Sequence, residues 1–78
     1  MTDRVLDLRG LKCPLPALHT RKALRNAEPG MLVRVECTDP LARIDIPNLV
    51  RETRDVLESV SEADGFVVFG IRKSRGEP

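Results

Sequence analysis

The 78-residue chain carries a formal net charge of +1, with 41 % hydrophobic residues and neither tryptophan nor tyrosine. A chain this short builds one core, so we expect a single domain over residues 1–78, with the core at about 4–73. The near-neutral charge and the scarcity of aromatic rings argue against direct contact with nucleic acid or a membrane. A deep substrate cavity is also excluded, which favours a carrier or adaptor that works with a macromolecular partner.

The first half of the chain predicts a strand, a helix and a second strand. Residues 4–8 alternate as a strand does, and Arg9–Gly10 then turns the chain. Apolar residues at helical spacing occupy 17–27, and Pro29–Gly30 stops that helix. Residues 31–38 alternate again, which predicts a half-buried strand and a parallel crossover. The inner face of that strand is expected to hold Val33, Val35 and Cys37.

The strongest helical periodicity lies in residues 46–57. Asp45 is the expected N-cap, and Pro47 then falls in the first turn, where its missing N–H has no partner to lose. The residues expected on the exposed face are Asn48, Arg51, Glu52, Arg54, Asp55 and Glu58.

A hairpin is expected to complete the domain. Residues 59–63 predict a strand whose start we place to within about three residues. Asp64–Gly65 is typical of a type I′ turn, and residues 66–72 form an apolar run rich in β formers. The resulting element order is βαβαββ.

The segment Cys13-Pro14-Leu15-Pro16 is poorly explained by structure alone. A residue before proline is driven out of the α region, so we expect Cys13 at the N-cap of the first helix and Pro14 at N1. Pro16 falls within the first turn, and Gly10 belongs to the turn that leads into the site. The geometry therefore predicts an exposed sulfur at a helix N-terminus.

Electrostatics at this position favour a reactive sulfur. The helix dipole, together with the positive charges of Lys12 and Arg9, is expected to hold the Cys13 pKa below the usual thiol value and to favour a persulfide anion. No second cysteine follows at dithiol spacing, which argues against a Cys-x-x-Cys oxidoreductase. A single exposed thiolate is better suited to transferring one sulfur atom.

Other residues that could carry chemistry have simpler interpretations. His19 lies about 240° around the helix from Cys13, so we expect a surface histidine and no Cys–His dyad. Cys37 is expected in the core, and one histidine with two scattered cysteines makes no structural zinc site. The aspartates expected in turns and caps are Asp7, Asp39 and Asp45.

Positive charge is concentrated around Cys13. Residues 1–27 contain six basic and two acidic side chains, whereas residues 28–64 contain four basic and nine acidic ones. The basic side chains Arg21, Lys22 and Arg25 are either a solvated helix face or a docking surface for a partner protein.

Several short motifs occur in a fixed order along nearly the whole chain. They are Leu6-Asp7, Gly10-Leu11, Cys13-Pro14-Leu15-Pro16, Arg21-Lys22, Pro29-Gly30, Thr38-Asp39-Pro40, Asp45-Ile46-Pro47, Asp64-Gly65 and Ile71-Arg72-Lys73. Together they resemble the TusA-type sulfurtransferase family, and the Gly-Leu-x-Cys-Pro-x-Pro setting is the most specific part. The resemblance implies an α/β (α+β) two-layer sandwich of two helices on a four-stranded mixed sheet.

The same resemblance implies that Cys13 carries a persulfide. Family members receive sulfane sulfur from a cysteine desulfurase or a rhodanese-like donor and pass it to an acceptor thiol, without a metal or organic cofactor. Such relays feed tRNA thiolation, molybdenum-cofactor maturation or sulfur oxidation, and this sequence does not choose among them. Many members have Gly-His where this chain has Arg54-Asp55.

We expect a cytoplasmic protein, because two cysteines make no disulfide framework and no N-terminal apolar segment suggests a signal or a membrane span. We also expect a monomer. Two alternatives to a sulfur carrier stay open. One is a non-catalytic regulatory or interaction module, in which the proline-rich segment only caps a helix. The other is a thiol peroxidase or redox sensor, which the lack of a resolving cysteine makes weaker.

Overall fold

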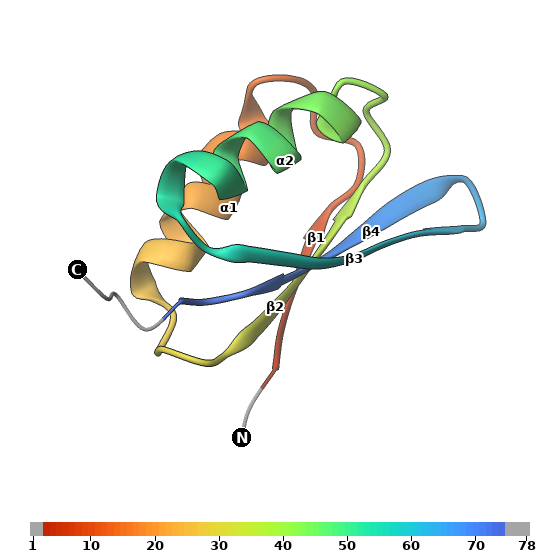
Figure 1. Ribbon diagram of the computed structural model, residues 1–78. Helices are drawn as coiled ribbons and strands as arrows, with labels where there is room; N and C mark the ends of the chain where they lie inside the picture. Colours follow the sequence, from red (N-terminus) through yellow and green to blue (C-terminus); the bar gives the residue numbers. More distant parts are fainter. Residues whose placement is uncertain (1–2, 75–78) are drawn as a thin grey trace.

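Two helices and four strands follow one another in the predicted order in the computed structural model, which describes residues 3–74. The elements are β1 (Arg4–Leu8), α1 (Leu15–Asn26), β2 (Leu32–Cys37), α2 (Ala42–Thr53), β3 (Val56–Ala63) and β4 (Phe66–Arg72). Both helices lie on one face of the sheet (Figure 1). The predicted two-layer arrangement is therefore confirmed. No helix within residues 3–74 has the length and apolar character needed to cross a bilayer.

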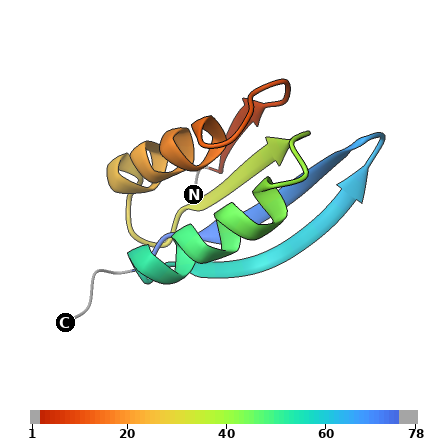
Figure 2. The same ribbon diagram turned by 90° about the horizontal axis from the view of Figure 1, so that it is seen from above.

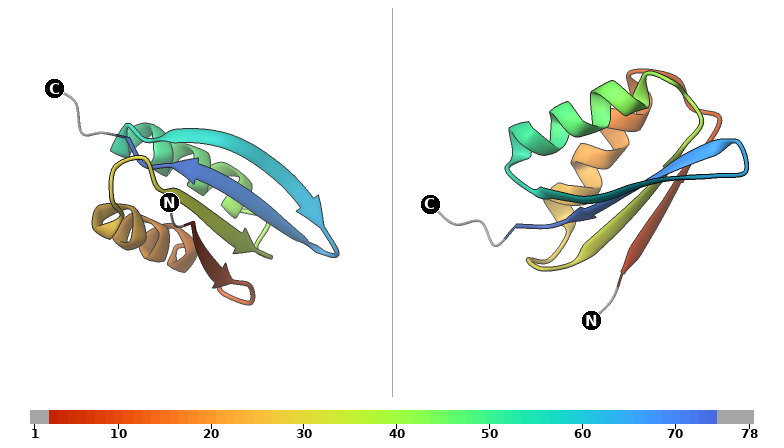
Figure 3. Two further views of the ribbon diagram at one scale, coloured as in Figure 1. Left: turned by 90° about the horizontal axis from the view of Figure 1, so that it is seen from below. Right: turned by 45° about the vertical axis from the view of Figure 1, so that its right-hand side comes forward.

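The four strands form one mixed sheet in the order β1-β2-β4-β3. β1 and β2 are parallel, whereas β4 runs antiparallel to both of its neighbours, β2 and β3. Seen from below, the sheet shows the face that the helices leave uncovered (Figure 3). Alternation along β2 and β4 directs apolar side chains toward the helices. The buried hydrophobic side chains of these two strands are Val33, Val35, Cys37, Val67, Phe69 and Ile71.

Parallel pairing of β1 with β2 decides where the loops lie. Each of these strands is followed by a loop and a helix, so both loops leave the sheet at the same edge. α1 and α2 lie side by side over the sheet, with their N-termini at that edge (Figure 2). Residues 9–14 and 38–41, which are far apart in sequence, are thereby brought together.

The start of α2 differs from the sequence-based expectation. The helix begins at Ala42, so Asp45 is inside its first turn and is not the N-cap. The reason is an earlier turn at Asp39, whose carboxylate accepts the Leu41 N–H at 3.0 Å and whose carbonyl accepts the Ala42 N–H at 3.0 Å. Pro47 consequently lies inside the helix, beyond the first turn where it was expected.

The end of α2 also differs. The helix stops at Thr53, and Arg54 adopts the left-handed conformation with φ 65°. Val56 and Leu57 belong to β3, although they continue the helical periodicity, because pairing with β4 satisfies their backbone in the sheet. Asp55, expected on an exposed helix face, is buried.

Asp64 and Gly65 connect β3 to β4, and Ala63 pairs with Phe66 across the turn. Gly65 has φ 83°, but Arg54 is the one non-glycine residue with positive φ in the part of the chain that the structure describes. A type I′ turn needs positive φ at both central residues, so that prediction is wrong although the hairpin itself is present.

Candidate functional site

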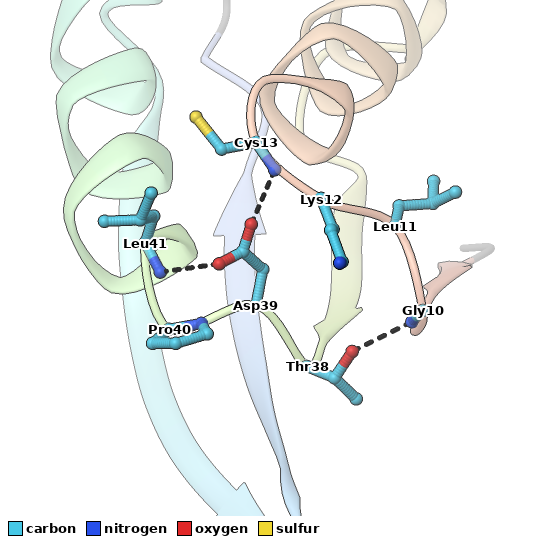
Figure 4. A pocket seen from close by; sticks show the side chains of 8 residues that line it. All are labelled: Gly10, Leu11, Lys12, Cys13, Thr38, Asp39, Pro40 and Leu41. Carbon is cyan, nitrogen blue, oxygen red and sulfur yellow. Dashed lines mark hydrogen bonds between the residues drawn. The ribbon is translucent and has the colours of Figure 1, made fainter.

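The loop after β1 and the loop after β2 are tied together by hydrogen bonds (Figure 4). The Gly10 N–H donates to Thr38 Oγ1 at 2.8 Å. The Cys13 N–H donates to Asp39 Oδ2 at 2.5 Å, while the other oxygen of the same carboxylate accepts the Leu41 N–H. These donors lower the pKa of Asp39 below its usual value, so the carboxylate that anchors Cys13 is ionised near neutral pH.

Cys13 is exposed and lies just before α1. Pro14 is the N-cap and Leu15 the first helical residue, so the prediction of Cys13 as N-cap and Pro14 as N1 is wrong by one position. The Leu15 N–H donates to the Lys12 carbonyl at 2.8 Å, which closes a turn across Cys13 and delays the helix. Pro16 lies in the first helical turn, as expected, and is buried.

The Cys13 sulfur is directed away from Asp39 and toward α2 (Figure 4). There Cys13 Sγ donates to Asp45 Oδ2 at 2.9 Å. This hydrogen bond to Asp45 raises the Cys13 pKa above its usual value, with further contributions from partial desolvation and from the negative charge of Asp39. The expected lowering is therefore contradicted, because a thiolate placed beside two carboxylates is less stable than the thiol.

Neither cation that was expected to assist Cys13 does so: Arg9 pairs with Asp7, and Lys12 acts on Asp39. Arg9 Nε lies 2.8 Å from Asp7 Oδ1 and 3.8 Å from Glu36 Oε1, and its guanidinium lies 5.2 Å from the centre of the Phe66 ring. The Arg9 bonds lower the pKa of Asp7 to about 2. Lys12 contributes instead to lowering the pKa of Asp39.

Two hollows meet at Cys13. One, of about 510 Å³, lies on the loop side. Its lining residues are Gly10, Leu11, Lys12, Cys13, Thr38, Asp39, Pro40 and Leu41. The other, of about 340 Å³, lies between the helices. Its lining residues are Cys13, Pro14, Ala17, Arg21, Asp45, Asn48, Leu49 and Glu52. Cys13 therefore lines both hollows, and its sulfur is directed toward the one between the helices.

Exposed apolar side chains occur on the first turns of both helices and next to them. Leu15 and Leu18 are 43 % and 55 % exposed on α1, and Leu41 and Ile44 are 49 % and 59 % exposed at the start of α2. Cys13 belongs to the loop that enters α1, and this loop lies at the same end of the helix layer as the first turns of both helices (Figure 2).

The basic residues of α1 do not form one patch around Cys13. Arg21 Nη2 lies 2.7 Å from Glu52 Oε1, so Arg21 bridges the two helices within the hollow between them. Lys22 is exposed and lines a separate hollow beside β1, and Arg25 is exposed in the last turn.

His19 and Cys37 lie where the sequence placed them. His19 is exposed and lines the same hollow as Lys22, which is separate from the two hollows that Cys13 lines. Cys37 is fully buried, and burial raises its pKa to about 11. Among residues 3–74, no three histidine, cysteine, aspartate or glutamate side chains gather as metal ligands do.

Asp39 and Asp45 are the residues of the site that sequence reasoning missed, since it assigned them to a turn and a cap. Their contacts with Cys13 span 26 and 32 positions of the sequence. The available signal was indirect: both follow the second strand of a predicted parallel pair, and the loops after such strands share one edge of the sheet.

The arrangement defines a class of protein, a small two-layer α/β domain with an exposed cysteine between its helix N-termini. A SirA-like protein from Desulfitobacterium hafniense has the same fold, with a TM-score of 0.78 over 94 % of this chain and 99 % of that one. At a sequence identity of 22 %, this comparison supports the shared fold alone.

Sequence comparisons identify the family. The profile for sulfurtransferase TusA matches residues 4–73, and the chain belongs to that family. It is 37 % identical over 71 residues to the sulfur carrier protein TusA of Pseudomonas aeruginosa, covering 91 % of this chain and 90 % of the relative. It is also 38 % identical over 72 residues to a "putative sulfur carrier protein" of Aquifex aeolicus, covering 92 % of this chain but 36 % of that longer protein.

Proposed function

We propose that this member of a sulfur carrier family holds sulfane sulfur as a persulfide on Cys13 and passes it from one partner protein to another. The observation that carries the proposal is the contrast between the two cysteines. Cys13 is exposed where two hollows meet, whereas Cys37 is fully buried and has a raised pKa. Only Cys13 is therefore accessible to a macromolecular donor.

The chemistry is two exchanges at sulfur with no net oxidation or reduction. In the first, Cys13 Sγ attacks the outer sulfur of a donor persulfide, a new S–S bond forms, and the donor leaves as a thiol that takes up the proton released by Cys13. In the second, an acceptor thiolate attacks the outer sulfur on Cys13, which returns to a thiol. No metal or organic cofactor is needed for either exchange.

The partners are a cysteine desulfurase or rhodanese-like donor and a protein acceptor, and we propose that the chain meets them as a cytoplasmic monomer. Four exposed apolar side chains at the start of the two helices are proposed to form an apolar rim that a partner contacts at the end of the helix layer where Cys13 lies; they are Leu15, Leu18, Leu41 and Ile44. Lys22 and Arg25, which are exposed on α1, are proposed to steer an acidic partner surface toward this rim. Arg21 is the weaker candidate because Glu52 already pairs with it.

The redox-sensor alternative is disfavoured by the position of the other cysteine. An oxidised sensor cysteine is usually resolved by a second thiol, and Cys37 is fully buried in the core and offers none to Cys13. A regulatory module, unlike a carrier, acquires no sulfur, so a measurement of sulfur loading separates the two functions.

Intact-mass spectrometry after incubation with a small persulfide donor tests the proposal. The expected result is one added sulfur atom that dithiothreitol removes, present in Cys37→Ser and absent in Cys13→Ser. A serine at position 13 can still donate to Asp45, so the fold of that variant should persist. Peptide mapping that finds the sulfur on Cys37, or on neither cysteine, would overturn the assignment.

A further inference from the structure

The charges around Cys13 are unusual for a cysteine that reacts as a thiolate. Asp45 Oδ2 accepts a hydrogen bond from the sulfur at 2.9 Å, and Asp39 Oδ2 accepts one from the Cys13 amide. Reactive cysteines are generally found beside cations, which stabilise the anion. Here the nearest charged partners, Asp39 and Asp45, stabilise the protonated form instead.

Cations on the surrounding elements are already engaged. Arg21 on α1 pairs with Glu52, Lys12 lies close enough to Asp39 to lower its pKa, and Arg9 pairs with Asp7. On α2, Arg43 pairs with Glu62 on β3, and Arg51 donates to Asn48. His19 lines a different hollow. Within residues 3–74, none of these side chains forms an ion pair or a hydrogen bond with Asp45, so its carboxylate is available to an incoming cation.

We propose that Asp45 is a positioning residue that holds Cys13 as a thiol in the free protein, and that partners which bring a positive charge to Asp45 release it for reaction. The proposal rests on the function proposed above. The partner is identified by its chemistry, as a protein that carries a lysine, an arginine or another cation beside its reacting sulfur.

Release follows from the hydrogen bond itself. When a cation pairs with the Asp45 carboxylate, the oxygen that accepted the thiol proton is engaged and the local negative charge is neutralised. The Cys13 proton then passes to solvent, and the thiolate attacks the outer sulfur of the donor. The bond between the two donor sulfurs breaks, and the donor thiolate takes a proton from solvent. The resting thiol is thus less exposed to adventitious oxidation, and it becomes more nucleophilic in a matched complex.

Thiol exchange with small disulfides of different charge tests this inference without sulfane sulfur. Cystamine is cationic, 2-hydroxyethyl disulfide is neutral and 3,3′-dithiodipropionate is anionic, and each forms a mixed disulfide with Cys13 while releasing one thiol. The wild-type protein should react with cystamine at least about tenfold faster than with the anionic reagent, after correction for the reactivity of each reagent with a free thiol. In Asp45→Asn this preference should fall to about threefold or less.

The pH profile of iodoacetamide alkylation provides the second readout. For wild-type Cys13 the midpoint should lie above the ordinary thiol value of about 8.5. In Asp45→Asn the midpoint should fall by about one pH unit, because the amide removes the negative charge that opposed the thiolate. Glu28→Gln, in the exposed loop between the C-terminal end of α1 and the start of β2, makes the same change in net charge at the opposite end of the helix and should alter neither readout. Peptide mapping confines both measurements to Cys13.

Asp45→Ser is a second variant in case the asparagine perturbs α2, and melting curves establish that each variant is folded. The inference is overturned if the alkylation midpoint or the charge preference of a folded Asp45 variant equals that of the wild-type protein. These reagents carry no transferable sulfane sulfur, so their result is independent of persulfide loading. A protein that shows the predicted charge preference but acquires no sulfur would overturn the proposed function alone.

Discussion

Arg54 occupies a backbone conformation that favours glycine, and replacing it tests how α2 ends. Its φ and ψ of 65° and 24° are left-handed. The Arg54 N–H bonds to the Arg51 carbonyl at 3.3 Å, and the Asp55 N–H to the Val50 carbonyl at 3.2 Å. This pair of bonds is a Schellman motif, in which the left-handed residue is usually glycine.

We predict that Arg54→Gly stabilises the protein. A residue with a side chain loses about 1–2 kcal/mol in the left-handed conformation, and the greater freedom of glycine in the unfolded chain offsets about 0.5–1 kcal/mol of that gain. The net increase in the free energy of unfolding should therefore be about 0.5–1 kcal/mol. For a domain of this size, about 1 kcal/mol corresponds to a rise of about 4–8 °C in melting temperature.

Thermal and urea unfolding, followed by circular dichroism, measure this change. Arg54→Ala is the matched control, because it removes the same side chain and its charge near the C-terminus of the helix but keeps the left-handed strain. Arg54→Gly should be more stable than Arg54→Ala by about 0.5–1 kcal/mol, the left-handed strain less the cost of glycine's freedom in the unfolded chain. If the alanine variant proved as stable as the glycine variant, the backbone of Arg54 would carry no strain and the reasoning would be wrong.

Three further predictions concern the core and the site. Thr20→Val should raise the free energy of unfolding by about 1 kcal/mol in urea titrations, because the buried Thr20 hydroxyl has no hydrogen-bond partner among residues 3–74. A loss of stability would show that the hydroxyl is paired. Cys37→Ser should cost about 1–3 kcal/mol, since it buries a hydroxyl in an apolar core, while mass spectrometry still finds the sulfur on Cys13. Reversing Lys22 and Arg25 to glutamate should slow sulfur loading from a cysteine desulfurase about tenfold at low salt and leave loading from an uncharged small persulfide unchanged; equal slowing of both reactions would remove the steering role.

Local patterns in the sequence were sufficient for most of the fold. Alternation along β2 assigned Val33, Val35 and Cys37 to the inner face, and the structure buries all three. The element order followed from periodicity and turn residues, since hydrophobic burial acts on each segment through its own repeat. The same reasoning identified Cys13 as the exposed thiol, because Pro14 and Pro16 place it ahead of a helix.

Element ends were less predictable, because hydrogen bonds from outside the element decide them. Hydrogen bonds to the Asp39 carboxylate and carbonyl start α2 early. Pairing with β4 places Val56 and Leu57 in β3, although both fit the helical repeat. Periodicity records which side chains are apolar, but it does not record which backbone partner is available.

The charge around Cys13 was decided by tertiary structure alone. Sequence neighbours suggested a thiol surrounded by positive charge, because Arg9 and Lys12 lie within four positions of Cys13. Parallel pairing of β1 with β2 instead brings Asp39 to its amide and Asp45 to its sulfur. The pKa of a thiol depends on charges within a few ångströms in space, and the nearest of these come from residues 26 and 32 positions further along the chain.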